Sequence, residues 1–161
     1  MSSTTSPKKI LLVCLGNICR SPMAEGLLRE MAKQRGLQIQ TDSAGTGDSH
    51  IGQAPDPRAQ TEMRRHGIRI SDLRARQFTR ADFERFDLLL AMDQQNLSDM
   101  QRLASSPELA AKARLMLDWS NDRKGGDVPD PWYGGSEGFG PVHNMLKEAL
   151  ENLLDEWEHE G

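Results

Sequence analysis

Residues 10–22 read ILLVCLGNICRSP, and their order suggests a strand followed by a loop and a helix. The first four residues are apolar without a break, which is typical of a strand covered on both faces. Ser21 and Pro22 are typical of a helix start, with the proline at the first helical position. An apolar stripe then supports a helix as far as Gly36: Met23, Leu27, Leu28 and Met31.

The rest of the chain continues this alternation of strands and helices. Apolar patterns predict further strands at residues 37–44, 86–92 and 113–117. Helices are predicted at 56–66, 79–82, 93–103, just after 106–107, and 142–157, whereas the Gly- and Pro-rich residues 125–140 read as a long loop. The alternation predicts an α/β protein: a three-layer α/β/α sandwich around a four-stranded parallel sheet, with a phosphate-binding loop after the first strand.

Length and charge narrow the possible classes of protein. The 161 residues fit a single domain, expected at residues 8–161 behind a disordered tail at 1–7. The net charge of −4 argues against a dedicated nucleic-acid or anionic-membrane binder. The apolar run at 10–15 is too short for a membrane span, and residues 16–20 do not resemble a cleavage site, so we expect a cytoplasmic protein.

The chain has two cysteines, Cys14 and Cys19. Two cysteines exclude a disulfide scaffold, and four scattered histidines do not suggest a structural zinc site, so no metal and no cofactor is expected.

The loop after the first strand has the chemistry of an anion site. Backbone N–H groups between a strand end and a helix start can converge on an anion, and Gly16 and Asn17 tolerate the positive φ angles that this requires. Cys14 at the base of the loop would be favoured as a thiolate there, and Arg20 offers a planar fork for phosphate oxygens. A Cys and an Arg six residues apart are weak evidence alone, and Cys14 could instead be a buried thiol at a strand end.

Residues 14–22 (CLGNICRSP) resemble the signature loop of the low molecular weight protein tyrosine phosphatases. The likeness continues, in the family's order and spacing, through residues 42–46, 76–77, 86–93 and 128–134. The resemblance implies hydrolysis of protein phosphotyrosine through a cysteinyl-phosphate intermediate. It also implies phosphoprotein partners, an autophosphorylating tyrosine kinase being one candidate, and a monomer or weak dimer.

The resemblance assigns catalytic roles to Cys14 as nucleophile, Arg20 as phosphate clamp and Asp130 as general acid and base. Taken alone, the Asp130-Pro131 pair would be read as a turn. Ser21 could donate a hydrogen bond to the Cys14 sulfur, although a helix cap is its ordinary role.

The remaining site residues follow from the same resemblance. Residues expected to bind substrate are Leu15, Gly16, Asn17, Ile18, Cys19, Ser49, His50, Trp132 and Tyr133. Ser49 stands where many relatives carry an aromatic side chain, which predicts a more open cleft. Asn17 and Ser43 are expected to brace the loop, and Asp72 is the nearest match to a histidine that the family often has in this network. Cys14 and Cys19 are implied to close a disulfide under peroxide, although Cys19 could equally be a small apolar loop residue.

Three other functions fit the sequence less well than phosphotyrosine hydrolysis. An arsenate reductase of the same fold needs additional cysteines to pass the oxidation on, and this chain has only two. A phosphate-binding module without turnover would lack Cys14, Arg20 or Asp130. A thiol redox protein would carry its cysteines in a C-x-x-C spacing.

Overall fold

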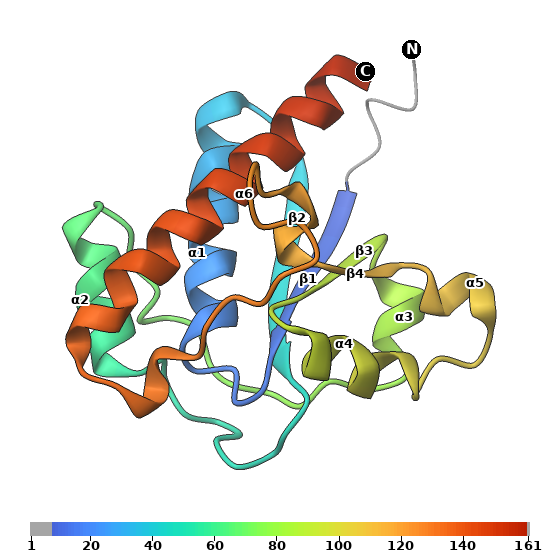
Figure 1. The fold of residues 1–161 in the computed structure, drawn as a ribbon, viewed down its shortest axis with the longest axis horizontal. Coiled ribbons are helices and arrows are strands. Elements are labelled where there is room, and N and C mark those ends of the chain that lie inside the picture. Colours follow the sequence, from blue (N-terminus) through green and yellow to red (C-terminus); the bar gives the residue numbers. More distant parts are fainter. Residues whose placement is uncertain (1–7, 161) are drawn as a thin grey trace.

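A four-stranded parallel sheet organises the chain, with the strands in the order β2-β1-β3-β4 (Figure 1). In this computed structural model, which describes residues 8–160, the strands are β1 Lys8–Cys14, β2 Ile39–Gly45, β3 Leu88–Ala91 and β4 Ala113–Leu115. The tail predicted at residues 1–7 lies outside the described residues. Parallel strands put their carboxyl ends at one edge of the sheet, which is where α/β folds place their sites.

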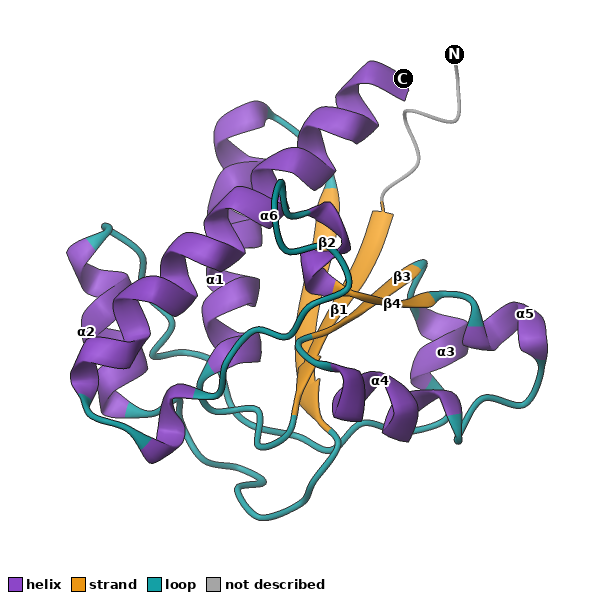
Figure 2. Ribbon diagram, viewed as in Figure 1, coloured by secondary structure: helices purple, strands orange, loops and turns teal. Residues whose placement is uncertain are grey.

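Helices cover both faces of this sheet (Figure 2). One layer contains α1 Arg20–Arg35, α2 Pro57–Arg65 and α6 Phe139–Glu160. The other contains α3 Asp82–Arg85, α4 Gln94–Gln101 and α5 Pro107–Ala110. The predicted three-layer α/β/α sandwich is therefore confirmed. Within residues 8–160, none of the helices combines the length and the apolar composition that a membrane span requires.

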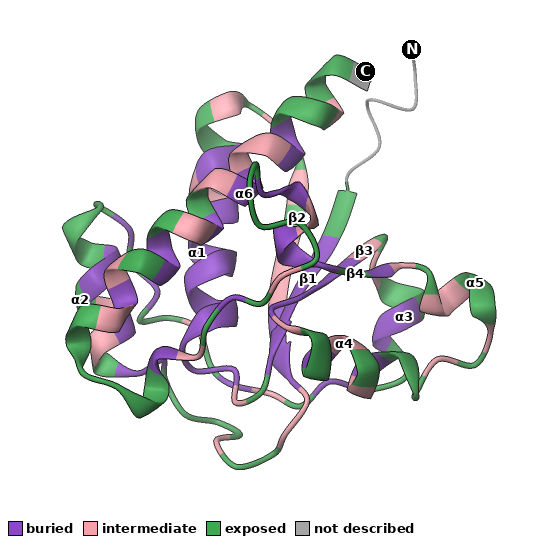
Figure 3. Ribbon diagram, viewed as in Figure 1, coloured by how far each residue is buried: buried purple, intermediate pink, exposed green. Residues whose placement is uncertain are grey.

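Strand β1 is buried on both faces, as its unbroken apolar run predicts (Figure 3). Ile10 and Leu12 belong to the core shared with α1 and α6. Leu11 and Val13 point to the opposite core. Side chains alternate across a strand, so only a strand with a helical layer on each side can be apolar at every position.

Several element boundaries differ from the sequence prediction. Helix α1 begins at Arg20, so Pro22 lies in its first turn rather than at its first position, and Ser21 is not the cap. The strand predicted at 86–92 is shorter, and residues 116–117, predicted as strand, belong to a 3₁₀ turn, η2 Met116–Trp119. The predicted loop at 125–140 contains two more 3₁₀ turns, η3 Pro131–Tyr133 and η4 Ser136–Gly138. A single turn is too short to produce a periodic sequence pattern.

The carboxyl ends of β1 and β2 are joined where the first loop begins. The backbone N–H of Thr46 donates to the Cys14 carbonyl at 2.9 Å, and that of Gly47 donates to the Leu15 carbonyl at 2.9 Å. A Cβ atom on Gly45 would lie 2.7 Å from the Leu15 carbonyl oxygen, so only glycine fits there. The loop after β1 is therefore anchored on the neighbouring strand.

Candidate active site

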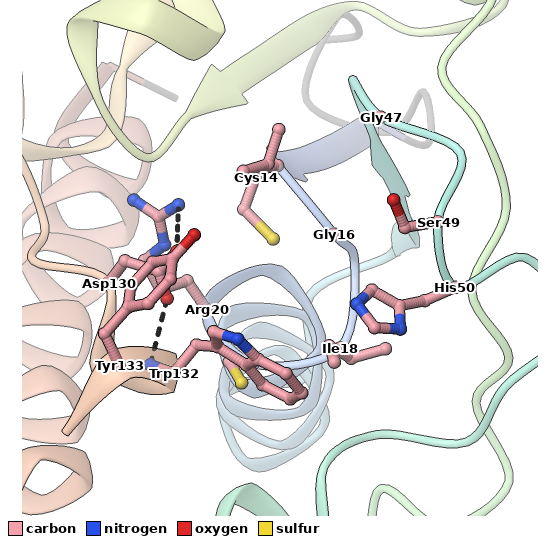
Figure 4. Close-up of a pocket in the computed structure, with 12 residues that line it drawn as sticks. Cys14, Gly16, Ile18, Arg20, Gly47, Ser49, His50, Asp130, Trp132 and Tyr133 are labelled. Carbon is pink, nitrogen blue, oxygen red and sulfur yellow. Dashed lines mark hydrogen bonds and ion pairs between the residues drawn. The ribbon is translucent and has the colours of Figure 1, made fainter.

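The loop between β1 and α1 forms the floor of a cavity of about 180 Å³ (Figure 4). The lining residues come from this loop, from the segment after β2 and from the segment around η3: Cys14, Leu15, Gly16, Ile18, Cys19, Arg20, Gly47, Ser49, His50, Asp130, Trp132 and Tyr133. Of the residues predicted to bind substrate, Asn17 alone does not line the cavity, because its side chain is buried beneath the loop. Gly47 lines it without having been predicted.

The sulfur of Cys14 lies at the base of the cavity. Its Sγ is 3.0 Å from Ser21 Oγ, and the backbone N–H of Asn17 donates to it at 3.3 Å. The cysteine is only 2% exposed, so access to its sulfur is through the cavity. The Asn17 N–H donates to this sulfur and the Ser21 hydroxyl lies where it can do so, and such donors stabilise negative charge on sulfur.

Arg20 is fixed by three oxygen atoms from two other segments. Its Nη1 donates to Asp93 Oδ2 at 2.7 Å and to the Val128 carbonyl at 3.0 Å, and its Nη2 lies 3.5 Å from Asp130 Oδ2. Burial opposes its charge, but the Cys14 sulfur and the Asp93 and Asp130 carboxylates outweigh this and raise the Arg20 pKa. The guanidinium is therefore a permanent cation beside Cys14.

Asp93 orients Arg20, a role that the sequence did not suggest. Its other oxygen, Oδ1, accepts the backbone N–H of Asn96 and so caps helix α4. The residue could be recognised in the sequence as a helix cap but not as a partner of Arg20, because 73 positions separate the two. The Asp93 carboxylate thus links the start of α4 to the guanidinium of Arg20.

Asp130 faces the cavity at the start of η3. Its Oδ1 accepts the backbone N–H of Trp132 at 3.0 Å, while its Oδ2 lies near Arg20 (Figure 4). The turn-forming role of this aspartate is therefore present, and it still leaves one carboxylate oxygen directed toward the floor of the cavity.

Arg58 of helix α2 holds the segment that carries Asp130. Its Nη1 donates to the Gly134 carbonyl at 2.7 Å, and its Nη2 donates to the Trp132 carbonyl at 3.2 Å. Arg58 is itself paired with Asp56. The sequence analysis did not single out Arg58, because nothing in the local pattern links it to a segment more than seventy residues away.

Aromatic rings stand on both sides of the cavity mouth. Trp132 is 41% exposed and Tyr133 80% exposed, and the His50 ring lies 5.5 Å from the Trp132 ring, centroid to centroid. A Cβ atom on Gly16 would lie 3.1 Å from His50 Cδ2, so the glycine leaves room for this ring. Ser49, beside His50, contributes a small side chain to the same wall.

Asn17 braces the loop from below through its side-chain amide. Its Nδ2 donates to Ser21 Oγ at 2.8 Å and to Ser43 Oγ at 3.0 Å, and its Oδ1 accepts the backbone N–H of Arg76 at 2.9 Å. Asn17 has a φ of 59°, whereas Gly16 is not among the residues with positive φ. The positive φ expected in this loop therefore falls on the asparagine, a residue that tolerates it.

The bracing ends at Glu25 and not at Asp72. Ser43 Oγ donates to Glu25 Oε1 at 2.7 Å, and burial raises the pKa of this glutamate, which is 4% exposed. The carboxylate of Asp72 is 64% exposed and pairs with Arg29 at 3.2 Å, so the expectation that Asp72 supports the loop is not met. Glu25 follows Ser21 by one helical turn, in the first half of α1, where every residue from Arg20 to Leu28 is buried. It lies outside the apolar stripe of this helix, so the periodic pattern gave no signal for its role.

Comparison with known proteins adds to this geometry. A family description, "Low molecular weight phosphotyrosine protein phosphatase", matches residues 9–161. The low molecular weight protein-tyrosine-phosphatase YfkJ of Bacillus subtilis is 42% identical over 147 residues, covering 90% of this chain and 92% of the relative. The human low molecular weight phosphotyrosine protein phosphatase is 39% identical over 151 residues, covering 92% and 94%.

Solved structures show the same relationship. The crystal structure of YfkJ superposes with a TM-score of 0.89 at 39% identity, covering 96% of this chain and 97% of that one. Wzb of Vibrio vulnificus, solved in complex with benzylphosphonate, superposes with a TM-score of 0.82 at 27% identity, covering 92% and 98%. The cysteine loop, the architecture and these matches agree, and the chain belongs to the low molecular weight phosphotyrosine protein phosphatase family.

Proposed function

We propose that this chain removes phosphate from phosphotyrosine in proteins by forming and then hydrolysing a cysteinyl-phosphate. The observation that carries the proposal is the convergence on one cavity of Cys14 and Arg20, from the two ends of the first loop, with Asp130 from a distant segment of the chain. A nucleophile, a cation for the equatorial oxygens and a proton donor are the groups that a two-step phosphoryl transfer needs.

In the first step the Cys14 thiolate attacks phosphorus, and the bond from phosphorus to the phenolic oxygen breaks. Asp130 gives its proton to the departing oxygen, so tyrosine leaves as a neutral phenol and Asp130 becomes a carboxylate. Arg20 and the N–H groups of the loop hold the three non-bridging oxygens, whose charge is greatest in transit.

In the second step water attacks the phosphorus of the cysteinyl-phosphate. The Asp130 carboxylate takes the proton of that water, and the sulfur–phosphorus bond breaks to release inorganic phosphate and the Cys14 thiolate. The Ser21 hydroxyl, 3.0 Å from Sγ, can donate to the sulfur as its charge returns. The site returns to its starting protonation state, so the phosphate ester and water are the only reactants consumed.

The mouth of the cavity fits an aromatic side chain presented by a protein. Among the residues that the structure describes, the exposed large apolar side chains are Leu15, Ile51, Leu103, Trp132 and Tyr133, and four of these five line the cavity or adjoin a residue that does. Benzylphosphonate, the ligand of Wzb, places a phenyl ring one carbon from a phosphonate. We infer a phosphotyrosyl protein as substrate, with an autophosphorylating tyrosine kinase as one candidate. The reaction requires a reduced Cys14, so we expect it to occur in a reducing compartment such as the cytoplasm.

The direct test compares two versions of one peptide, phosphorylated on tyrosine or on serine, and traps the intermediate by rapid acid quench. We expect phosphate release from the tyrosine peptide, together with label covalently held by the protein during turnover. Equal rates on both peptides would contradict the substrate class, and turnover without bound label would contradict the covalent route. Phosphatase-inactive protein that oxidised its thiols in response to arsenate would favour the arsenate reductase alternative.

Replacing Ser49 by Tyr is expected to lower KM for phenyl phosphate. A ring at position 49 would add one face to the wall that His50 and Trp132 form, and an aromatic contact is worth about 0.5–1.5 kcal/mol, or roughly a 2- to 12-fold change. Steady-state kinetics on phenyl phosphate and on an alkyl phosphate measure the effect. Ser49→Ala is the matched control, and an unchanged or higher KM for the aryl ester alone would refute the idea.

Cys19 is expected to protect Cys14 from irreversible oxidation, as the family resemblance implies. Peroxide would convert the Cys14 thiolate to a sulfenic acid, and Cys19 would then attack that sulfur and displace hydroxide, leaving a disulfide. Burial, together with Asp56 and other nearby acidic groups, raises the pKa of the Cys19 thiol. Because the thiolate is the attacking form, ring closure should become faster as pH rises.

The measurement is activity regained after a peroxide pulse, catalase and a dithiol, normalised to each protein's own starting activity. The parent should regain more than Cys19→Ser, and the difference should widen at higher pH. Equal recovery of the two proteins at every pH would show that Cys19 is only a small residue of the loop.

A further inference from the structure

Helices α2 and α6 bring together three side chains that the catalytic proposal does not use. Glu62 lies on α2, His66 follows one turn later as the residue that caps the end of this helix, and His143 projects from α6. One ligand atom from each lies within 4.8 Å of the other two. His66 and His143 are stacked, with ring centroids 3.5 Å apart and an angle of 6° between the planes. None of the three lines the catalytic cavity.

We propose that Glu62, His66 and His143 form a zinc-binding site that joins α2 to α6. Two imidazole nitrogens and one carboxylate are a recurring ligand set for Zn²⁺, with water completing the coordination. Four scattered histidines gave no sign of this site in the sequence, because His66 and His143 meet only when the two helices pack.

The orientation of His143 supports metal binding. This ring is 3% exposed and its Nδ1 lies 3.1 Å from the side-chain oxygen of Asn144, which can only accept a hydrogen bond. The Nδ1 atom therefore carries the ring proton, and Nε2 keeps its lone pair. A ligating histidine is usually fixed in this way, by a carbonyl or carboxylate on its other nitrogen.

Glu62 is held ready beside the rings. Its side chain is 8% exposed, with Oε1 3.3 Å from Arg65 Nη1. Its Oε2 accepts a hydrogen bond from His66 Nε2 at 2.9 Å, and a bound ion would take the place of that proton. Arg65 is 69% exposed, so an ion can displace it at the small cost typical of a surface pair. Lys147 on α6 and Arg65 on α2 both repel a cation and thus limit its affinity.

The lone pair of an imidazole nitrogen lies in the plane of its ring, so two nearly parallel rings 3.5 Å apart cannot both direct a lone pair at one ion. One ring must therefore tilt when the ion binds. His66 is the ring that can move, because its side chain is 36% exposed while that of His143 is enclosed. The bound ion replaces a ring stack by two coordinate bonds and adds a link between the helices.

Cobalt(II) is the probe of choice, because it takes the same ligands as Zn²⁺ and gives visible absorption bands when bound. The untagged chain carrying Cys14→Ser removes the catalytic thiolate as a competing ligand. We expect one ion per chain. Loss of a ligand in Glu62→Gln, His66→Gln or His143→Phe should weaken binding by about 100-fold or more, since even outer-shell partners contribute 10–100-fold. His159→Gln, which alters a histidine outside the cluster, is the matched control.

A second readout uses the parent protein, in which Zn²⁺ should raise the melting temperature as its concentration increases. The increase should be absent in Glu62→Gln and His66→Gln and retained in His159→Gln. The comparison of Glu62→Gln and His66→Gln with His159→Gln tests the zinc site even if His143→Phe, which alters a buried position, fails to fold. Absence of saturable Co²⁺ binding, or binding that the Glu62 and His66 variants leave unchanged, would overturn the proposal.

Discussion

Replacement of Cys14 by Ser is expected to reduce kcat for p-nitrophenyl phosphate by about 10⁴-fold or more and to abolish the trapped phosphoenzyme. A serine hydroxyl is not ionised at neutral pH, so it needs a base to become a nucleophile. The hydrogen-bond partners of the Cys14 sulfur among the described residues are Ser21 Oγ and the Asn17 N–H, neither of which is a base. These two partners can stabilise a thiolate, but neither can deprotonate a serine hydroxyl.

Binding of inorganic phosphate separates loss of the nucleophile from loss of the fold. Arg20 and the loop N–H groups remain in Cys14→Ser, so calorimetry should show phosphate bound with an affinity near that of the parent. A variant that binds phosphate and does not turn over supports the assignment. Turnover within tenfold of the parent, with phosphate binding intact, would refute Cys14 as nucleophile and with it the covalent mechanism.

Replacement of Asp130 by Asn is expected to lower kcat by about 10²- to 10⁴-fold for phenyl phosphate. The loss should be much smaller for p-nitrophenyl phosphate, because nitrophenolate leaves readily without a proton. Asparagine caps a helical turn as well as aspartate does, so it can still accept the Trp132 N–H and preserve η3. Steady-state kinetics on the two esters therefore measure the loss of the proton donor, because the substitution is expected to leave the η3 turn in place.

The pairing of Asp130 with Arg20 provides an internal control for this variant. Asparagine removes the negative charge that lies 3.5 Å from Arg20 Nη2, so the guanidinium has one competitor fewer for an oxyanion. Vanadate or phosphate should bind Asp130→Asn as tightly as the parent, or more tightly, while kcat falls. Equal losses of kcat on both esters would contradict the role of Asp130 as the acid.

The architecture could be predicted because its signals are local and repeated. The strand β1 was predicted from an unbroken apolar run and the helix α6 from an apolar stripe of helical period, and both elements occur where these patterns placed them. The errors concern boundaries and single turns. Residues 116–117 are apolar enough for a strand but form part of η2, and a turn of three or four residues has no period to detect.

The residues of the candidate active site differ in the same way in how far the sequence predicts them. Residues within one loop or motif, such as Cys14, Arg20 and Ser21, could be placed from sequence because a few positions separate them. Residues from distant segments could be placed only where the family resemblance named them, as for Asp130 and Ser43. Asp93 and Arg58 could not be placed in this way, and they make their contacts only when the chain packs. Asp72 shows the opposite error, in which position along the chain suggested a contact that the side chain makes instead with Arg29 at the surface.

The bracing of Asn17 has a consequence for selectivity. The three hydrogen bonds of its side chain all run to groups of the protein, so the shape of the loop is independent of which tetrahedral oxyanion lies above it. A rigid receptor of this kind accepts the common phosphoryl head of every monoester and cannot recognise what is attached to it. We therefore expect discrimination among substrates to come from residues around the mouth, such as Ser49, His50, Trp132 and Tyr133. Exchange of those four side chains should redirect the enzyme to other esters without altering its chemistry.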